Sequence, residues 1–169
     1  MSALAIDQII TTANDEMQKA RDQLEVEENG RTVAAYQGNI VGYKKLFAHM
    51  AAEFFLTQIA IEDLGDVPLK ILDLDDDHLE IMRQDIGILK ADPAWTATLA
   101  RIDADIETMK NHLLFRAEKS RDLDLCQGQY KGETVYTRLF ESVADEIGRR
   151  QAERDRKAKN PELFADATA

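Results

Sequence analysis

Apolar residues recur along this chain at spacings of three and four, which is the period of amphipathic helices. The first set predicts a helix over 3–28 that packs through a narrow apolar seam, with Asn29-Gly30 ending it. A heavier seam, rich in aromatic residues, predicts a second helix over 31–64. The first seam consists of Ile6, Ile10, Ala13, Met17, Ala20 and Leu24.

The remaining helices follow a connector over 65–92. Gly65 and Pro68 end the second helix, and a short helix with one apolar face follows. That face holds Leu79, Met82, Ile86 and Leu89. Asp92-Pro93 supplies an N-cap and a first helical residue for a third long helix over 93–118. A fourth is expected over 125–157, followed by a tail over 160–169.

One motif occurs twice. Gln-Gly-x-x-x-Gly stands at 37–42 and again at 127–132, and each copy precedes Tyr-x-x-Leu-Phe. The offset between copies is 90 at the glycines and 93 at the tyrosines, so the second copy has three extra residues between them. Adding 89 to the numbers of the first seam gives another apolar seam, from Trp95 to Leu113. The pattern predicts an internal duplication, although two independent amphipathic helices would also produce the seams.

The predicted fold is therefore all-α, with two long antiparallel helical hairpins related by duplication. The first hairpin spans 1–64, the connector with its short helix 65–92, and the second hairpin 93–159. At 169 residues the chain is expected to form a single helical bundle with a substantial core.

The paired glycines predict close helix packing. A glycine inside a helix costs about 1 kcal/mol relative to Ala, and a four-residue spacing allows another backbone to cross there, as in membrane helices. A kink is the alternative. The predicted helix-packing motif comprises Gln37, Gly38, Gly42, Tyr43, Phe47, Gln127, Gly128, Gly132, Tyr136 and Phe140.

A second group of apolar residues points away from the predicted seam. Phe55, Leu56 and Ile59 lie off the inward face of the second helix. The 79–89 helix can cover only part of that face, so these residues predict contact with another subunit. Leu163 and Phe164 are isolated apolar residues in the tail and are expected either to dock on a neighbour or to be disordered. The protein is accordingly expected to form a homo-oligomer or to join a larger assembly.

Charge is unevenly placed. The net charge is −11, yet residues 149–159 hold six basic and two acidic residues, a local +4, and the first 148 residues carry −13. An acidic body is not expected to bind nucleic acid through phosphates. No membrane span or secretory signal is visible. The single Cys126 is expected to be a small buried residue.

No catalytic, cofactor or metal motif is expected. Asp73-x-Asp75-x-Asp77 copies three positions of an EF-hand loop, but His78 replaces its glycine. Residues 62–67 resemble half of the metal site of the all-α MazG-type nucleotide pyrophosphohydrolases; only Glu53 stands where the family has Glu-Glu-x-x-Glu, and Pro68 interrupts the helix.

The two Gln-Gly-x-x-x-Gly helices, each followed by Leu-Phe, resemble the small helical-hairpin proteins of tailed-bacteriophage structural gene clusters. The resemblance implies a virion component or assembly factor, cytoplasmic or in the virion. The expected function is non-enzymatic structural or assembly work through helix packing and self-association. Two alternatives are an acidic inhibitor that mimics nucleic acid and a metal-dependent nucleotide pyrophosphohydrolase.

Overall fold

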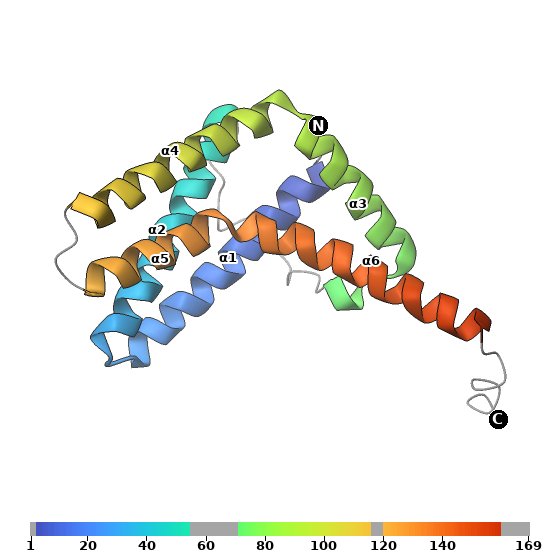
Figure 1. The fold of residues 1–169 in the computed structure, drawn as a ribbon, viewed down its shortest axis with the longest axis horizontal. Coiled ribbons are helices and arrows are strands. Elements are labelled where there is room, and N and C mark those ends of the chain that lie inside the picture. Colours follow the sequence, from blue (N-terminus) through green and yellow to red (C-terminus); the bar gives the residue numbers. More distant parts are fainter. Residues whose placement is uncertain (1–2, 55–70, 116–119, 160–169) are drawn as a thin grey trace.

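The computed structural model describes residues 3–54, 71–115 and 120–159 (Figure 1). Every regular element in these ranges is helical, which confirms the all-α prediction. The elements are α1 (Ala3–Val26), α2 (Gly30–Glu53), the short 3₁₀ helix η1 (Ile71–Asp73), α3 (Asp76–Ala91), α4 (Pro93–Phe115), α5 (Ser120–Glu133) and α6 (Val135–Lys159).

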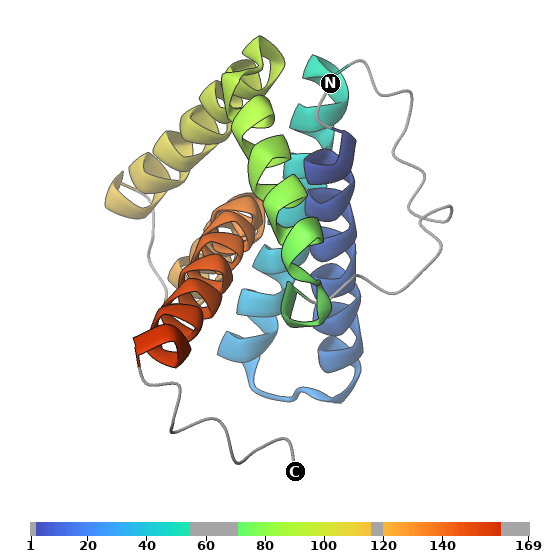
Figure 2. The same ribbon diagram turned by 90° about the vertical axis from the view of Figure 1, so that its right-hand side faces the viewer.

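The helices form a bundle in which α2 is central. Figures 1 and 2 show α1 and α2 as neighbours joined by a tight connection, whereas α4 and α5, the second pair along the chain, contact each other little because α5 packs mainly on α2. Helix α2 contacts α1, α4 and α5, whereas α3 and α6 pack on α1. That the two pairs arose by duplication remains a prediction.

The core follows the predicted seams closely. Five of the six residues of the first seam are buried on α1, and all four apolar residues of the short connector helix are buried on α3. Aromatic side chains from α4 and α6 close one side of the core. The ring centroid of Trp95 lies 5.0 Å from that of Tyr136 in an edge-on arrangement and 6.1 Å from that of Phe140, a geometry that aromatic pairs prefer.

The first turns of α2 and α1 are capped in different ways. Asn29 was predicted, with Gly30, to end the first helix; instead α1 ends at Val26 and Asn29 begins α2. The Asn29 side chain accepts hydrogen bonds from the amides of Arg31 and Thr32, satisfying donors that a helix start leaves free. Helix α1 is capped from another helix, because the Asp85 carboxylate of α3 accepts a hydrogen bond from the Ala5 amide at 2.6 Å.

The fourth predicted helix, 125–157, is broken at Thr134 into α5 and α6 and begins earlier, at Ser120. The Thr134 hydroxyl donates to the Tyr130 carbonyl at 2.8 Å, and the Thr137 hydroxyl donates to the Thr134 carbonyl at 2.7 Å. Threonine hydroxyls that bond to nearby carbonyls compete with regular helix bonding. The break falls among the three extra residues of the second motif copy, between Gly132 and Tyr136.

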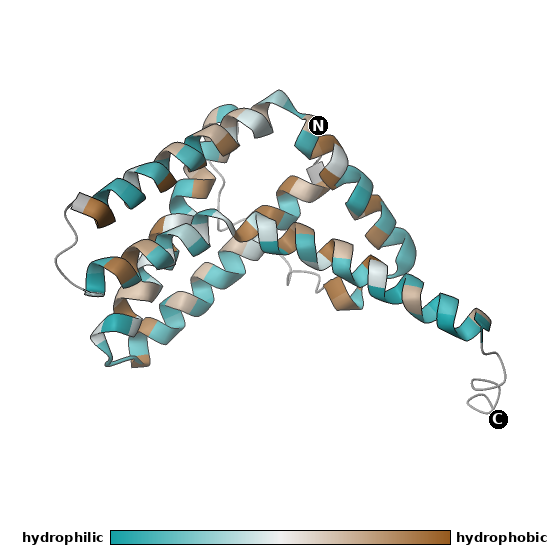
Figure 3. Ribbon diagram, viewed as in Figure 1, coloured by the Kyte–Doolittle hydropathy of each residue, from teal (hydrophilic) through white to brown (hydrophobic). Residues whose placement is uncertain are grey.

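Helix α2 ends at Glu53, with Phe54 as its C-cap. The rest of the predicted second helix, to residue 64, lies outside the described residues. At the other end of the chain, α6 extends beyond the body as a hydrophilic rod (Figure 3). All residues from 151 to 159 are exposed, as expected from the charged sequence there. Among the described residues, no helix is long and apolar enough to cross a membrane.

Candidate functional site

Helices α2 and α5 cross in backbone contact at the duplicated motif. A Cβ atom at Gly38 would lie 2.1 Å from the Leu125 carbonyl oxygen, and one at Gly42 would lie 2.2 Å from the Gln129 carbonyl oxygen. Real Cβ atoms essentially never approach another atom this closely. Any side chain at these positions would therefore force the two helices apart.

The crossing is symmetric. Gly128 and Gly132 of α5 face the carbonyl oxygens of Ala35 and Asn39 on α2, and a Cβ atom at Gly128 would again lie 2.1 Å from its neighbour. Each contact on one helix has a counterpart on the other at an offset of 90, as Ala35 has in Leu125. A local twofold axis thus relates the two motif copies.

The paired helices run in the same direction. Gly38 faces Leu125 and Gln129, whereas Gly42 faces Gln129 and Glu133, so the residue numbers rise together on both helices. Parallel neighbours cannot be joined by a short turn. The 66 residues from Phe54 to Lys119 connect them, including α3 and α4.

The other predicted motif residues divide between core and surface. Tyr43 and Phe47 are buried in the main core, and Tyr136 and Phe140 pack against it from α6. Gln37 and Gln127 are exposed. The glutamines of the motif therefore lie outside the contact that the glycines make.

A polar cluster lies beside the crossing. Glu133, the last residue of α5, is fully buried and accepts a hydrogen bond from the Gln129 amide at 2.7 Å. Lys45 of α2 lies 3.8 Å from the same Glu133 oxygen and 3.0 Å from the Asp105 carboxylate of α4. His49 Nε2 lies 3.1 Å from that Asp105 oxygen. The cluster ties three helices together around one lysine.

Burial gives the two carboxyl groups different acidities. Burial raises the pKa of Glu133, and the Gln129 hydrogen bond and nearby Lys45 offset this only in part. Burial also acts to raise the pKa of Asp105, but hydrogen bonds from Lys45 and His49 outweigh it and bring that pKa below its ordinary value. Lys45 therefore lies beside two different carboxyl groups. That of Asp105 ionises readily, whereas burial opposes the ionisation of Glu133.

Two buried oxygen atoms near the crossing have no hydrogen-bond partner within the described residues. They are Glu133 Oε2 and Asn39 Oδ1. An unsatisfied buried acceptor costs about 1–3 kcal/mol, and more when the group is charged. The orphan oxygen on Glu133 therefore favours its protonated form.

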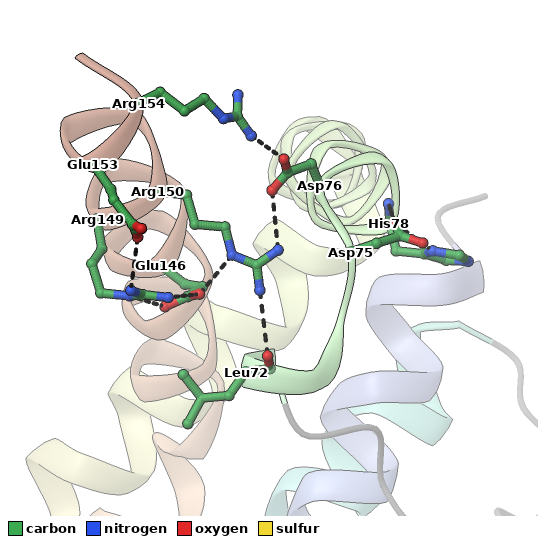
Figure 4. Close-up of polar contacts among 9 residues, drawn as sticks. All are labelled: Leu72, Asp75, Asp76, His78, Glu146, Arg149, Arg150, Glu153 and Arg154. Atoms are coloured by element: carbon green, nitrogen blue, oxygen red, sulfur yellow. Dashed lines mark hydrogen bonds and ion pairs between the residues drawn. The ribbon is translucent and has the colours of Figure 1, made fainter. Parts of the chain in front are cut away.

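An arginine cluster fastens α6 to the start of α3 (Figure 4). Arg150 donates hydrogen bonds to Glu146 at 2.7 Å, to Asp76 at 3.0 Å and to the Leu72 carbonyl at 3.3 Å. Arg154 also binds Asp76. Because these guanidinium groups are bound by carboxylates of the same chain, the cluster acts as a clasp between helices.

Glu146 is the buried centre of this clasp. It is 5% exposed and accepts hydrogen bonds from Arg149 as well as Arg150. The hydrogen bonds from these two arginines lower the pKa of Glu146 to about 2. Glu146 therefore stays ionised well into the acid range.

An open apolar pocket of about 310 Å³ lies between α4 and α5. Ile106, Met109 and Leu113 line it from α4, and Leu123 and Tyr130 line it from α5. Cys126, buried as expected, also lines it. This surface was not predicted from the sequence, which directed attention to the end of the second helix.

The remaining predicted contact residues cannot be placed. Phe55, Leu56, Ile59, Leu163 and Phe164 all lie outside the described residues. So do the acidic positions between 62 and 66 that resemble a hydrolase site. Among the described residues, no group of three His, Cys, Asp or Glu side chains could hold a metal ion. His49 contacts Asp105, and Glu53 accepts a hydrogen bond from Arg101.

No family model, curated protein or solved structure matches this chain.

Proposed function

We propose that this protein is a non-enzymatic structural or assembly protein that acts through helix packing and self-association. The observation that carries the proposal is the open apolar surface at the α4–α5 end of the bundle. Tyr130 and Leu123, which line the pocket, are 52% and 41% exposed, and Leu114, next to Leu113 in the chain, is 75% exposed. Apolar surface that gathers around a pocket is typical of an interaction site.

The glycine crossing supports the same proposal in a different way. All four glycines face backbone atoms of the same chain, so they hold α2 against α5 and are not free to contact another subunit. A close crossing and the arginine clasp both hold the helices in a fixed arrangement. A fixed helical frame with an apolar face that its described residues leave open suits a subunit that is assembled with others.

Sedimentation of the full chain at micromolar concentrations tests the proposal. We expect species heavier than the 19.1 kDa monomer, with a mass that rises with concentration. A single monomeric species throughout, with no partner recovered from the native host, would refute the proposed function. The resemblance to bacteriophage structural proteins adds a virion role to the proposal, and neighbouring genes that encode head or tail proteins would support it.

A further inference from the structure

The apolar seam of α4 extends beyond the part of the helix that packs in the core. Near the start of the helix, Trp95 and Ile102 are each 1% exposed. Met109, two turns beyond Ile102, is still buried, but one turn further Leu113 is only half-buried, and Leu114 is largely exposed. The seam keeps its spacing of three and four along this length. The final turn of α4 therefore presents a helix-packing surface that the described part of the chain leaves uncovered.

The occupant suited to such a surface is another helix. Residues spaced by three and four on α4, with Leu123 and Tyr130 on α5, form a groove of the type that receives a helix. A flexible segment or a small ligand would not require this regular spacing over two turns.

The charges at the rim indicate which helix fits. Lys110 lines the groove, and exposed Glu107 pairs with it within α4 at 3.5 Å. A second α4 lying antiparallel, with a twofold axis near the middle of 106–113, places Glu107 of each copy within a turn of Lys110 of the other. One acid and one base on a single rim are thus complementary to a second copy of themselves.

We propose that the α4–α5 groove is a homodimer interface in which the α4 helices of two copies pack antiparallel, each seated in the groove of the other. Ile106, Met109 and Leu113 form the apolar centre, and Glu107 and Lys110 form cross-subunit ion pairs at its rim. This inference rests on the proposed function, because it names the surface through which the chain self-associates.

Charge reversal at the rim tests the arrangement. Glu107→Lys places two lysines opposite each other, and Lys110→Glu places two glutamates opposite each other. We expect each variant alone to weaken the dimer about tenfold, since twofold symmetry duplicates every changed contact. An equimolar mixture of the two variants pairs lysines with glutamates and should restore dimerisation as a heterodimer. Sedimentation of each variant and of the mixture measures this directly.

Glu80 and Arg83 on α3 provide the matched control. They form an exposed pair at the same i,i+3 spacing, away from the groove. Glu80→Lys and Arg83→Glu change the net charge by the same amounts and should leave dimerisation unchanged. Circular dichroism of all four variants should show the same helix content, which separates a lost interface from a lost fold.

The outcomes separate the interface from the function. If the wild-type chain associates but neither rim reversal weakens it, or the mixture fails to restore it, the α4–α5 interface is wrong and the proposed self-association stands on another surface. If a peptide of residues 160–169 blocks dimerisation while charge reversal at Glu107 or Lys110 has no effect, the groove holds the tail and the inference is overturned. If the wild-type chain remains monomeric, the proposed self-association itself fails.

Discussion

Gly38 and Gly128 each lie against the backbone of the helix that carries the other. A Cβ atom on either would lie 2.1 Å from a carbonyl oxygen, that of Leu125 or that of Ala35. A backbone oxygen cannot rotate aside as a side chain can. The contact therefore requires glycine on both sides, and its symmetry explains why the motif is present twice.

Gly38→Ala should destabilise the protein by about 1–3 kcal/mol, because the helices must separate to accept the methyl group. This cost exceeds the gain of about 1 kcal/mol in helix propensity. Urea unfolding measures the difference. Gly148→Ala is the control, since a Cβ atom there would meet nothing within 4 Å, and it should stabilise α6 by about 0.5–1 kcal/mol. A gain in stability for Gly38→Ala would mean that the crossing is looser than described.

Glu133→Gln should stabilise the protein at neutral pH and have little effect in acid. Burial raises the pKa of Glu133 above its ordinary value of 4.5, so the unfolded chain releases this proton at a lower pH than the folded one. The stabilising contribution of Glu133 to the free energy of unfolding is fully present below pH 4.5 and is lost as the pH rises through the pKa of Glu133 in the folded state. Gln keeps the neutral shape and the bond with Gln129.

Urea unfolding near pH 5 and near pH 8 measures this effect. We expect the advantage of the variant to grow between the two, on the order of 1 kcal/mol. The groups facing Glu133 are Lys45, His49 and Asp105, so the same comparison in a His49→Gln background checks that the effect comes from Glu133. Identical pH profiles for wild type and variant would show that Glu133 is not a buried acid.

Glu146→Gln should make the protein less sensitive to acid. Hydrogen bonds from Arg149 and Arg150 lower the pKa of Glu146 from 4.5 to about 2. Its contribution is therefore present above pH 4.5 and is lost as the pH falls toward 2. The variant should be less stable than wild type at neutral pH, with the two converging in acid. Thermal unfolding across that range is the measurement, with exposed Glu141→Gln as the control; curves that stay parallel would exclude this role.

Asp85→Ala should destabilise α1 by about 1 kcal/mol, the usual cost of removing a side chain that caps a helix start. The carboxylate of Asp85 reaches the Ala5 amide from α3, so the loss should also loosen the contact between those helices. Asp85→Asn keeps an acceptor oxygen and should cost less. Hydrogen exchange at the first turn of α1 distinguishes the two variants, and equal protection in both would argue against the cap.

Local patterns predicted the helices well where packing and capping agree. Leu79, Met82, Ile86 and Leu89 share one face of α3, and all four are buried as predicted. Asp92 precedes Pro93 at the start of α4, and its carboxylate accepts a hydrogen bond from the Ala94 amide at 2.9 Å. Both features depend on residues within one or two turns of each other, which a sequence pattern can encode.

The α2–α5 crossing and the polar cluster beside it join residues that lie far apart in the chain. The spacing of apolar residues does not show which distant residues meet. Glycine spacing indicated a close crossing but could not identify α5 as the partner of α2. Nothing in Gly132-Glu133-Thr134 signals a buried carboxylate, because the burial of Glu133 comes from α2 and α4 packing over the end of α5. The offset between the motif copies changes by three residues at the place where the helix breaks, but a change in offset alone does not distinguish a break from a longer helix.

The parallel pairing of α2 and α5 has a consequence for how the chain reaches its native state. Each helix carries two glycines in its interior, so neither is expected to persist as an isolated helix before the two have docked. Their contacts join residues about 90 positions apart, and contacts of such separation slow folding. The hairpin of α1 and α2 can form early, but its second helix gains its full support only when α5 has been made and docked. A ribosome-bound chain that ends before residue 120 should therefore hold α2 only weakly and be open to proteases there.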